Sequence, residues 1–255
     1  MSITMPENVF IQKYTVRSYE IDSFGKVSVM GICNYLQDIA GSHAARLGVS
    51  VEDLFLRKMT WVLSRLHIRV YKYPLWKEEI RIETWPSGVH GRFALRDFQI
   101  FDKNDTLIGD ATTSWMLINF NTNKPISMPD FITNIKIPDR NRAIADPFEK
   151  IPVLEKENVV KNFNVRLSDL DINQHVNNVN YIEWAVETIP LTIWQKYRLS
   201  ELEISFRAES NYGDRIVSQT QHIENDTRQI FLHRLLRESD QREVAVLKTR
   251  WKKHL

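Results

Sequence analysis

The sequence predicts an α+β protein in which two similar units follow one another, each a helix packed on an antiparallel sheet. Two observations favour this fold class. The chain repeats itself, and each copy places a helix-length apolar pattern ahead of several alternating strand patterns. The chain has 255 residues, of which 43% are hydrophobic and 26% are charged. This composition is that of a globular protein, and the length allows two domains.

Two blocks of the first half return in the same order in the second half. The first block begins at Tyr14 (YTVRSYEIDSFGKVSVMGICNYLQD) and returns at Phe163 (FNVRLSDLDINQHVNNVNYIEWAVE), an offset of 149 residues. The second begins at Ser64 (SRLHIRVYKYPLWKEEIRIET) and returns at Ser200 (SELEISFRAESNYGDRIVSQT), an offset of 136 residues. The first copy therefore carries about 13 extra residues between the blocks, which we place at residues 49–61.

Each copy contains the same elements in the same order. A short strand is expected first, at about residues 12–19 and 161–167, and a helix follows at about 30–47 and 177–189. The first helix has apolar residues at helical spacing, at Ile32, Leu36, Ile39, Ala40 and Leu47. Strands with an apolar residue at every second position come next. The clearest are Leu66, Ile68 and Val70 in the first copy and Leu202, Ile204 and Phe206 in the second.

The polar, proline-containing stretch 139–158 separates the copies, and we interpret it as a linker. The predicted domains are therefore residues 1–138 and residues 159–255. No apolar run is long enough to predict a membrane span, and a net charge of +2 is too small to indicate nucleic-acid binding. One cysteine, Cys33, and an N-terminus without the pattern of a secretory signal favour a cytoplasmic protein.

The densest polar cluster lies just ahead of the second predicted helix. It contains Asp171, Asn173 and His175 within five residues. Helix capping is the better explanation for Asp171 alone. His175 is a candidate general base, because a helix N-terminus disfavours a cation and so keeps an imidazole neutral.

The first copy serves as an internal control for this cluster. It keeps the aspartate as Asp22, but it has Phe24 in place of Asn173 and Lys26 in place of His175. A lysine with its ordinary pKa is not a base at neutral pH. We therefore expect Asp171 to be partly structural, and the amide and the imidazole to serve one site only.

The segment 168–184, SDLDINQHVNNVNYIEW, strongly resembles the signature of plant and bacterial acyl-acyl-carrier-protein thioesterases. The likeness covers most of the chain, including VRSYEID, TWVLSRLHIRVYKYPLWKEEIRIETW and ATTSWMLIN in the first copy. The resemblance implies two tandem hotdog domains, in each of which a long helix packs on a curved antiparallel sheet. It also implies a thioester hydrolase that releases free fatty acid from acyl-acyl-carrier protein (acyl-ACP) in fatty-acid biosynthesis, with no cofactor and no metal.

Carried over residue by residue, the resemblance assigns Asp171, Asn173 and His175 to the active-site loop and Glu209 to the acid on the following strand. From the pattern alone, Glu209 would be a solvated residue at a strand end. Family members often have a cysteine directly after this acid, and here that residue is Ser210. This departure favours carboxylate–histidine chemistry over a thiol nucleophile. Either Glu209 and His175 activate a water, or a carboxylate attacks and forms an anhydride.

The resemblance also implies partners, namely an acidic carrier protein and a fatty acyl chain. The first copy is then the non-catalytic one that shapes the choice of chain length. Its candidate residues, each of which a plain core role explains better, are Met30, Phe55, Met59 and Trp61. The last strand carries basic residues that could dock the carrier or keep an edge strand soluble, namely Arg242, Lys248, Arg250, Lys252 and Lys253. We expect a monomer with an internal pseudo-dimer, or a homodimer.

Two other functions stay open at this point. An acyl-CoA thioesterase of the 4-hydroxybenzoyl-CoA type shares the Asp-x-x-x-His-Val-Asn-Asn pattern, although such proteins are usually single hotdog units. A non-enzymatic acyl-chain sensor would need a basic DNA-binding element outside the repeats, and the two ends are too short for one.

Overall fold

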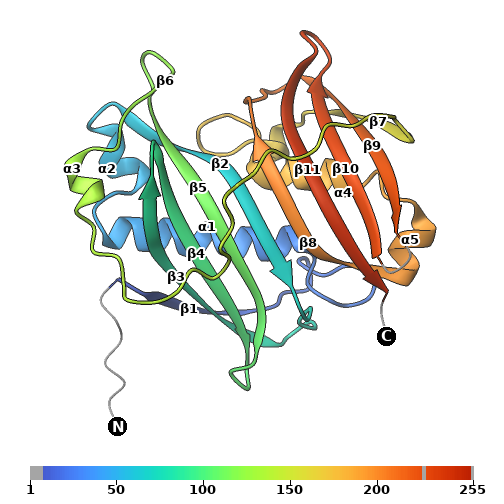
Figure 1. Cartoon of the computed structure of the whole chain (residues 1–255), viewed down its shortest axis with the longest axis horizontal. Helices are drawn as coiled ribbons and strands as arrows, with labels where there is room; N and C mark the ends of the chain where they lie inside the picture. Colours follow the sequence, from blue (N-terminus) through green and yellow to red (C-terminus); the bar gives the residue numbers. More distant parts are fainter. Residues whose placement is uncertain (1–7, 226–227, 254–255) are drawn as a thin grey trace. The chain divides into compact units, whose positions relative to one another are not determined.

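The computed structural model describes residues 8–225 and 228–253 (Figure 1). The chain divides into two compact units. One holds Met1–Ser64 and Val70–Pro147, and the other holds Arg65–Arg69 and Phe148–Leu255. Residues 1–7, on which the expectation about a secretory signal rests, lie outside the described residues. Within the described part of the chain, no helix combines the length and the apolar character needed to cross a bilayer.

The first unit is an antiparallel sheet with one long helix. Its strands lie in the order β1-β3-β4-β5-β2, with the short β6 paired to β5. The elements are β1 (Phe10–Thr15), α1 (Val29–Arg46), α2 (Val51–Phe55), β2 (Met59–Val70), β3 (Glu79–His90), β4 (Phe93–Asp102), β5 (Leu107–Asn119), β6 (Lys124–Pro125) and α3 (Asp130–Thr133). The turn before α1 ends β1 earlier than the expected residue 19.

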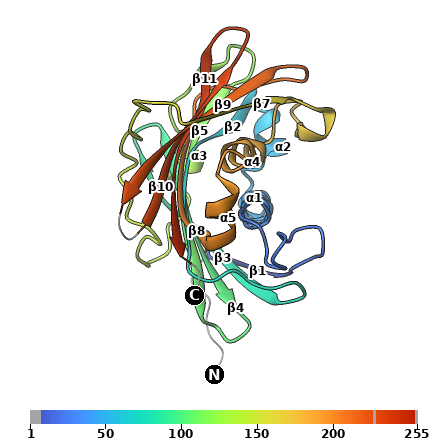
Figure 2. The same ribbon diagram turned by 90° about the vertical axis from the view of Figure 1, so that its right-hand side faces the viewer.

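Helix α1 begins where the sequence supplies a cap. The Ser28 hydroxyl accepts a hydrogen bond from the Gly31 N–H (3.0 Å). Ile32, Leu36 and Ile39 are buried on one side of the helix, as their spacing predicts. The helix contacts β1 and β3, and Figure 2 shows it along one face of these strands. The helix therefore supplies the apolar core of this unit.

The extra residues of the first copy lie between α1 and β2, where the repeat places them. This segment contains α2, which begins with a capping box between Ser50 and Asp53. Its apolar residues Val49, Leu54 and Met59 form a buried cluster with Leu117 of β5 and Ile132 of α3, and Trp61 packs against this cluster. Phe55, in contrast, is exposed. The core role favoured for Met59 and Trp61 therefore agrees with the structure.

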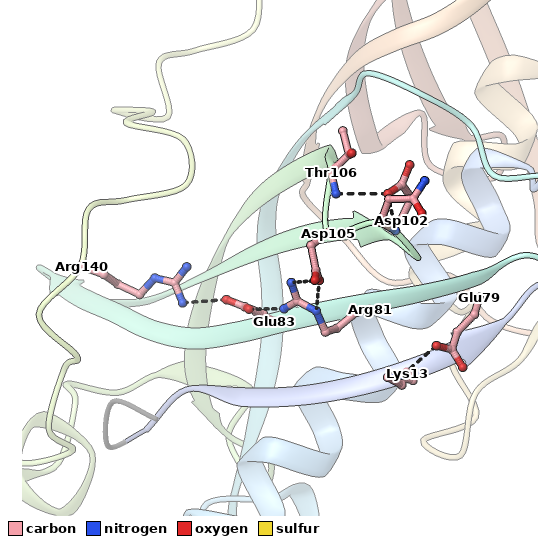
Figure 3. A network of polar contacts seen from close by, with 9 residues as sticks. Lys13, Glu79, Arg81, Glu83, Asp102, Asp105, Thr106 and Arg140 are labelled. Atoms are coloured by element: carbon pink, nitrogen blue, oxygen red, sulfur yellow. Dashed lines mark hydrogen bonds and ion pairs between the residues drawn. The ribbon is translucent and has the colours of Figure 1, made fainter. Parts of the chain in front are cut away.

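The first part of the predicted linker is bound to the sheet of the first unit. The Asp97 carboxylate is buried and accepts hydrogen bonds from Arg142 Nε (2.9 Å) and the Ala143 N–H (2.8 Å). Arg140 Nη1 donates to Glu83 (3.0 Å, Figure 3) and stacks on the Trp85 ring. Figure 1 shows this segment passing in front of the strands, with α1 behind them. Two arginines thus fasten residues 140–143 to this unit.

The second unit repeats the plan. Its strands lie in the order β8-β11-β10-β9-β7, and residues 65–69 of β2, which belong to this unit, pair with β8. The elements are β7 (Val159–Asn164), the 3₁₀ turn Leu167–Asp169, α4 (Asn178–Val186), α5 (Leu191–Lys196), β8 (Tyr197–Phe206), β9 (Arg215–Asn225), β10 (Arg228–Arg237) and β11 (Arg242–Lys253).

Helix α4 is shorter than the predicted helix 177–189, because Pro190 cannot continue it. The chain resumes as α5 directly after this proline, so α4 and α5 together take the place of the unbroken α1. The Asn177 side chain caps α4 by accepting from the Val179 N–H (3.0 Å). The helix contacts β9, β10 and β11 of its own unit.

A buried histidine lies within this second core. His233 bonds through Nδ1 to the Thr220 hydroxyl (2.9 Å) and through Nε2 to the Thr249 hydroxyl (2.9 Å). Burial disfavours the charged ring and lowers the pKa of His233 to about 3. The ring is therefore neutral at physiological pH.

The positive charge of the last strand, β11, is partly neutralised by acidic residues of β8. Arg250 Nη1 lies 2.8 Å from Glu201 and 2.9 Å from Glu203, and Lys248 lies 3.9 Å from Glu203. Lys252 and Lys253 are exposed at the end of the strand. The positive charge expected over the whole stretch is therefore compensated at Lys248 and Arg250.

Candidate active site

The predicted active-site loop, residues 171–175, is closed by the side chain of Asp171. Its Oδ1 accepts hydrogen bonds from the backbone N–H groups of Asn173 (2.8 Å) and His175 (3.3 Å). Two backbone bonds support the turn, from the Asp171 N–H to the His175 carbonyl (2.7 Å) and from the Gln174 N–H to the Asp171 carbonyl (3.0 Å). Asp171 therefore sets the conformation of the loop that carries the other two predicted site residues, Asn173 and His175.

The first unit contains the same loop with different side chains. Asp22 Oδ1 accepts from the N–H groups of Phe24 (2.8 Å) and Lys26 (3.2 Å). Gly25 has φ +72°, and Gln174 takes the corresponding left-handed conformation at φ +64°. Because the aspartate makes these bonds in both copies, the expected structural part of its role has a direct geometric basis.

His175 and Glu209 come together at the end of the loop. The distance from His175 Nε2 to Glu209 Oε2 is 3.4 Å. The side chains are 38% and 48% exposed, so water and a substrate can reach both. One residue further along each segment, the Val176 N–H donates to the Ser210 carbonyl (3.0 Å). This bond ties the two segments together beside the pair.

Asn173 lies on the same loop with an exposed side chain. Its backbone N–H is bound by Asp171, and among the described residues its side chain has no hydrogen bond to His175 or Glu209. Of the four predicted residues, His175 and Glu209 thus lie together, Asp171 shapes the loop, and Asn173 lies on that loop with its side chain exposed.

Ser210, which occupies the position of the family's frequent cysteine, is fully buried with 0% exposure. The neighbouring Tyr181 hydroxyl is also buried, and burial raises the pKa of Tyr181 to about 12. Cys33 is buried in α1, and burial raises its pKa to about 12 as well. A side chain at position 210 is therefore poorly placed to attack a substrate, and the thiol of Cys33 is kept neutral.

Sequence reasoning missed two residues that hold this site. Asp169 is buried, and its carboxylate accepts from the Arg166 N–H (2.7 Å), while its carbonyl accepts from Asn177 and Asn180. The offset of 149 residues aligns Asp169 with Glu20, which accepts from the Arg17 N–H (2.7 Å), so the repeat offered a signal. The other is Arg237, whose Nη1 donates to the Glu209 carbonyl (2.8 Å).

One group of side chains away from this site has the composition of a metal site. The ligand atoms of His67, Glu201 and Glu203 lie within 4.8 Å of one another. However, Arg69 Nε (3.2 Å) and Arg250 Nη1 (2.8 Å) already bind the Glu201 carboxylate. Because guanidinium groups supply the positive charge there, we assign no metal to this cluster.

Comparison with known proteins places the chain in a family. The model of the acyl-ACP thioesterase N-terminal domain matches residues 7–135, and the model of the C-terminal domain matches residues 154–253. The oleoyl-acyl carrier protein thioesterase of Coriandrum sativum is 32% identical over 89% of this chain and 66% of that protein. The chain thus spans just under two thirds of the length of this relative.

Solved structures agree. A crystal structure of an acyl-ACP thioesterase from Bacteroides thetaiotaomicron has a TM-score of 0.84 and 28% identity, covering 96% of this chain and 98% of that one. A 12:0-ACP thioesterase from Umbellularia californica has a TM-score of 0.86 and 26% identity, covering 96% and 94%. These matches confirm the predicted α+β hotdog fold. The chain belongs to the acyl-ACP thioesterase family.

Proposed function

We propose that this protein hydrolyses the thioester bond of acyl-ACP and releases a free fatty acid during fatty-acid biosynthesis. The observation that carries the proposal is the pair formed by His175 and Glu209, 3.4 Å apart and open to solvent, in a chain of this family. An imidazole and a carboxylate at this distance can share the task of holding and deprotonating a water.

In the proposed reaction the water oxygen attacks the thioester carbonyl carbon while His175 takes its proton, with Glu209 holding the ring and the water. The tetrahedral intermediate then loses the carrier thiol, which receives the proton from His175, and the acyl group leaves as the acid. Asn173 and a backbone N–H at the start of α4 would stabilise the oxyanion. The N–H groups of Val176, Asn177 and Val179 already have acceptors, whereas that of Asn178 has none among the described residues.

Kinetics of matched variants test the roles of the pair. We expect His175→Ala and Glu209→Gln each to lower kcat by about 10²–10⁴-fold, the usual contribution of a general base. Lys26→Ala alters the equivalent position of the first copy and should leave kcat unchanged. A folded His175→Ala enzyme with the wild-type rate would remove the histidine from the mechanism.

The alternative chemistry has a carboxylate attack the substrate and form an anhydride that water then opens. A single turnover in ¹⁸O-labelled water tests for this route, because water that opens the anhydride at the carbon of the enzyme carboxylate leaves its oxygen in the enzyme. Direct attack by water requires that all label is found in the fatty acid. Label in the Glu209 carboxylate of the enzyme would overturn it.

The rival substrate is acyl-CoA, because the loop Asp171–Asn178 carries the pattern that acyl-CoA thioesterases of the 4-hydroxybenzoyl-CoA type share. Matches to both domains of the acyl-ACP family favour the carrier protein. Release of free thiol from acyl-ACP and from acyl-CoA, measured side by side, decides between them. A higher kcat/KM for acyl-CoA would contradict the proposal.

The proposal extends to partner, compartment and chain length. We infer that an acidic carrier docks on exposed basic residues, including Lys252 and Lys253, so that KM for acyl-ACP should rise with salt.

The lone buried Cys33 suits the reducing cytoplasm. The first unit would shape the choice of acyl chain, with Met30, Phe55, Met59 and Trp61 as candidates. The acids released in a fatty-acid-synthesising host would identify the preferred chain.

A further inference from the structure

We propose that Arg237 is a positioning residue that holds Glu209 against His175. This inference rests on the proposed function, in which Glu209 acts on the substrate water. Arg237 is the last residue of β10, and its Nη1 donates to the Glu209 carbonyl oxygen at 2.8 Å. Its side chain is only 16% exposed, and the same Nη1 lies 3.9 Å from the Asp214 carboxylate.

The guanidinium is itself oriented by a second carboxylate. Arg237 Nε donates to Asp240 Oδ1 (3.0 Å), and Nη2 donates to Asp240 Oδ2 (2.7 Å). This paired arrangement leaves Nη1 directed to Glu209. The same bonds lower the pKa of Asp240 to about 2, so its carboxylate stays ionised at physiological pH. Asp240 therefore fixes the plane of the group that holds the Glu209 carbonyl.

Backbone hydrogen bonds hold the residues on both sides of Glu209. The Ala208 N–H donates to the Val244 carbonyl (3.3 Å), and the Ser210 carbonyl accepts from Val176 (3.0 Å). The carbonyl of Glu209 itself is held by the arginine side chain. Without Arg237 this peptide can rotate between two fixed neighbours, which would swing the carboxylate away from the imidazole 3.4 Å distant.

The non-catalytic copy shows that a basic residue here is not a requirement of the fold. Ile80 pairs with Asp102 in the first unit as Ile216 pairs with Arg237 in the second, so the two positions are equivalent. Asp102 accepts hydrogen bonds from its own turn, at Asn104 (2.9 Å) and Thr106 (3.1 Å, Figure 3), and its other oxygen accepts from Lys72 Nζ (3.0 Å). The end of β4 thus carries an acid, Asp102, in the first unit. The end of β10 in the second unit carries a cation, Arg237, which binds the Glu209 carbonyl.

The test compares Arg237→Gln with Arg237→Lys and with a matched control. We expect Arg237→Gln to lower kcat for acyl-ACP by about 10–100-fold with little change in KM, because a displacement of about 1 Å in a reacting group costs that much. Arg237→Lys keeps one charged donor and should recover part of the rate. Arg215→Gln removes an arginine that pairs with Glu238 (3.6 Å), and it should leave kcat unchanged.

A second readout separates positioning from a general structural role. In a Glu209→Gln background, adding Arg237→Gln should lower kcat no further, whereas a structural defect would lower it in both backgrounds. A wild-type kcat in Arg237→Gln, with a loss in Glu209→Gln, overturns this inference and leaves the proposed function standing. A wild-type kcat in Glu209→Gln itself removes the role of Glu209 and this inference with it, whereas absence of acyl-ACP hydrolysis by the unaltered protein would overturn the proposed function. Thermal melting confirms that each variant is folded.

Discussion

The paired aspartates Asp22 and Asp171 allow a substitution whose effect on stability and effect on activity can be measured apart. Asp171→Ala removes two side-chain hydrogen bonds, of 2.8 and 3.3 Å, from the loop that carries His175. Asp22→Ala removes two matching bonds, of 2.8 and 3.2 Å, from a loop that carries no reactive pair. The two variants therefore delete the same interaction in two chemical settings.

The expected cost in stability is similar for both. A well-formed hydrogen bond to a charged group contributes about 1.5–3 kcal/mol, but one bond of each pair is long and both loops are partly exposed. Loss of a comparable capping aspartate costs about 0.5–2 kcal/mol. We expect each variant to lower the free energy of unfolding by about 1–2 kcal/mol, measured by urea denaturation.

The effects on activity should differ. Asp171→Ala frees the N–H groups of Asn173 and His175, so the imidazole loses its place opposite Glu209, and kcat should fall by about 10²-fold. Asp22→Ala should keep the wild-type kcat. Asp171→Asn retains an oxygen acceptor at the same position and should keep at least about a tenth of the rate. If Asp171→Asn is as inactive as Asp171→Ala, the negative charge takes part in the reaction and the loop-holding argument is wrong.

Three further outcomes follow from buried groups. Ser210→Cys should keep the wild-type rate and resist iodoacetamide, because position 210 is fully buried; inactivation by the reagent would contradict this. Below pH 6.5 the unfolded chain protonates His233, whose pKa in the folded protein is about 3, so stability present above that pH is lost on acidification. His233→Gln should reduce the slope of the free energy of unfolding against pH by about 1.4 kcal/mol per pH unit, measured by urea denaturation at several pH values. An unchanged slope would refute this. Arg142→Met leaves the buried Asp97 carboxylate without its cation and should cost about 3 kcal/mol in the same assay; a cost below about 1 kcal/mol would show that the remaining donors suffice.

Helices were predictable where a local signal marked their ends. Helix α1 was expected at 30–47 and runs from Val29 to Arg46, because apolar spacing and the Ser28 cap both lie in the local sequence. The second helix was expected to reach residue 189, but α4 ends at Val186. The predicted helix already stopped before Pro190, but α4 ends three residues earlier, because a proline also removes the hydrogen bond to the carbonyl four residues before it, here that of Val186.

The site was predictable to the extent that its residues are close in sequence. Asp171, Asn173 and His175 share one turn. The comparison with Asp22 in the first copy already separated the structural role expected of Asp171 from the site role expected of the other two. Glu209 needed the family resemblance, since a glutamate at a strand end is usually only solvated. Glu209 lies three residues beyond the end of β8 and not on the strand itself, contrary to the expectation. Arg237 was missed because it ends β10, far along the chain from Glu209, and only the register of β9, β10 and β11 brings its side chain to that carbonyl.

The two copies show how one fold can keep a loop and change its chemistry. The backbone bond from Val27 to Pro74 (2.9 Å) in the first unit matches the bond from Val176 to Ser210 (3.0 Å) in the second, so both units join the loop to the strand end. What differs is the side chains beside this bond. Lys26 stands where His175 does, and Asp102 stands where Arg237 does. Because the backbone hydrogen bonds are the same, the presence or absence of the His175–Glu209 pair needs no change of fold. The residues that repeat are therefore those that hold the loop, and the residues that do not repeat are where the chemistry should be sought.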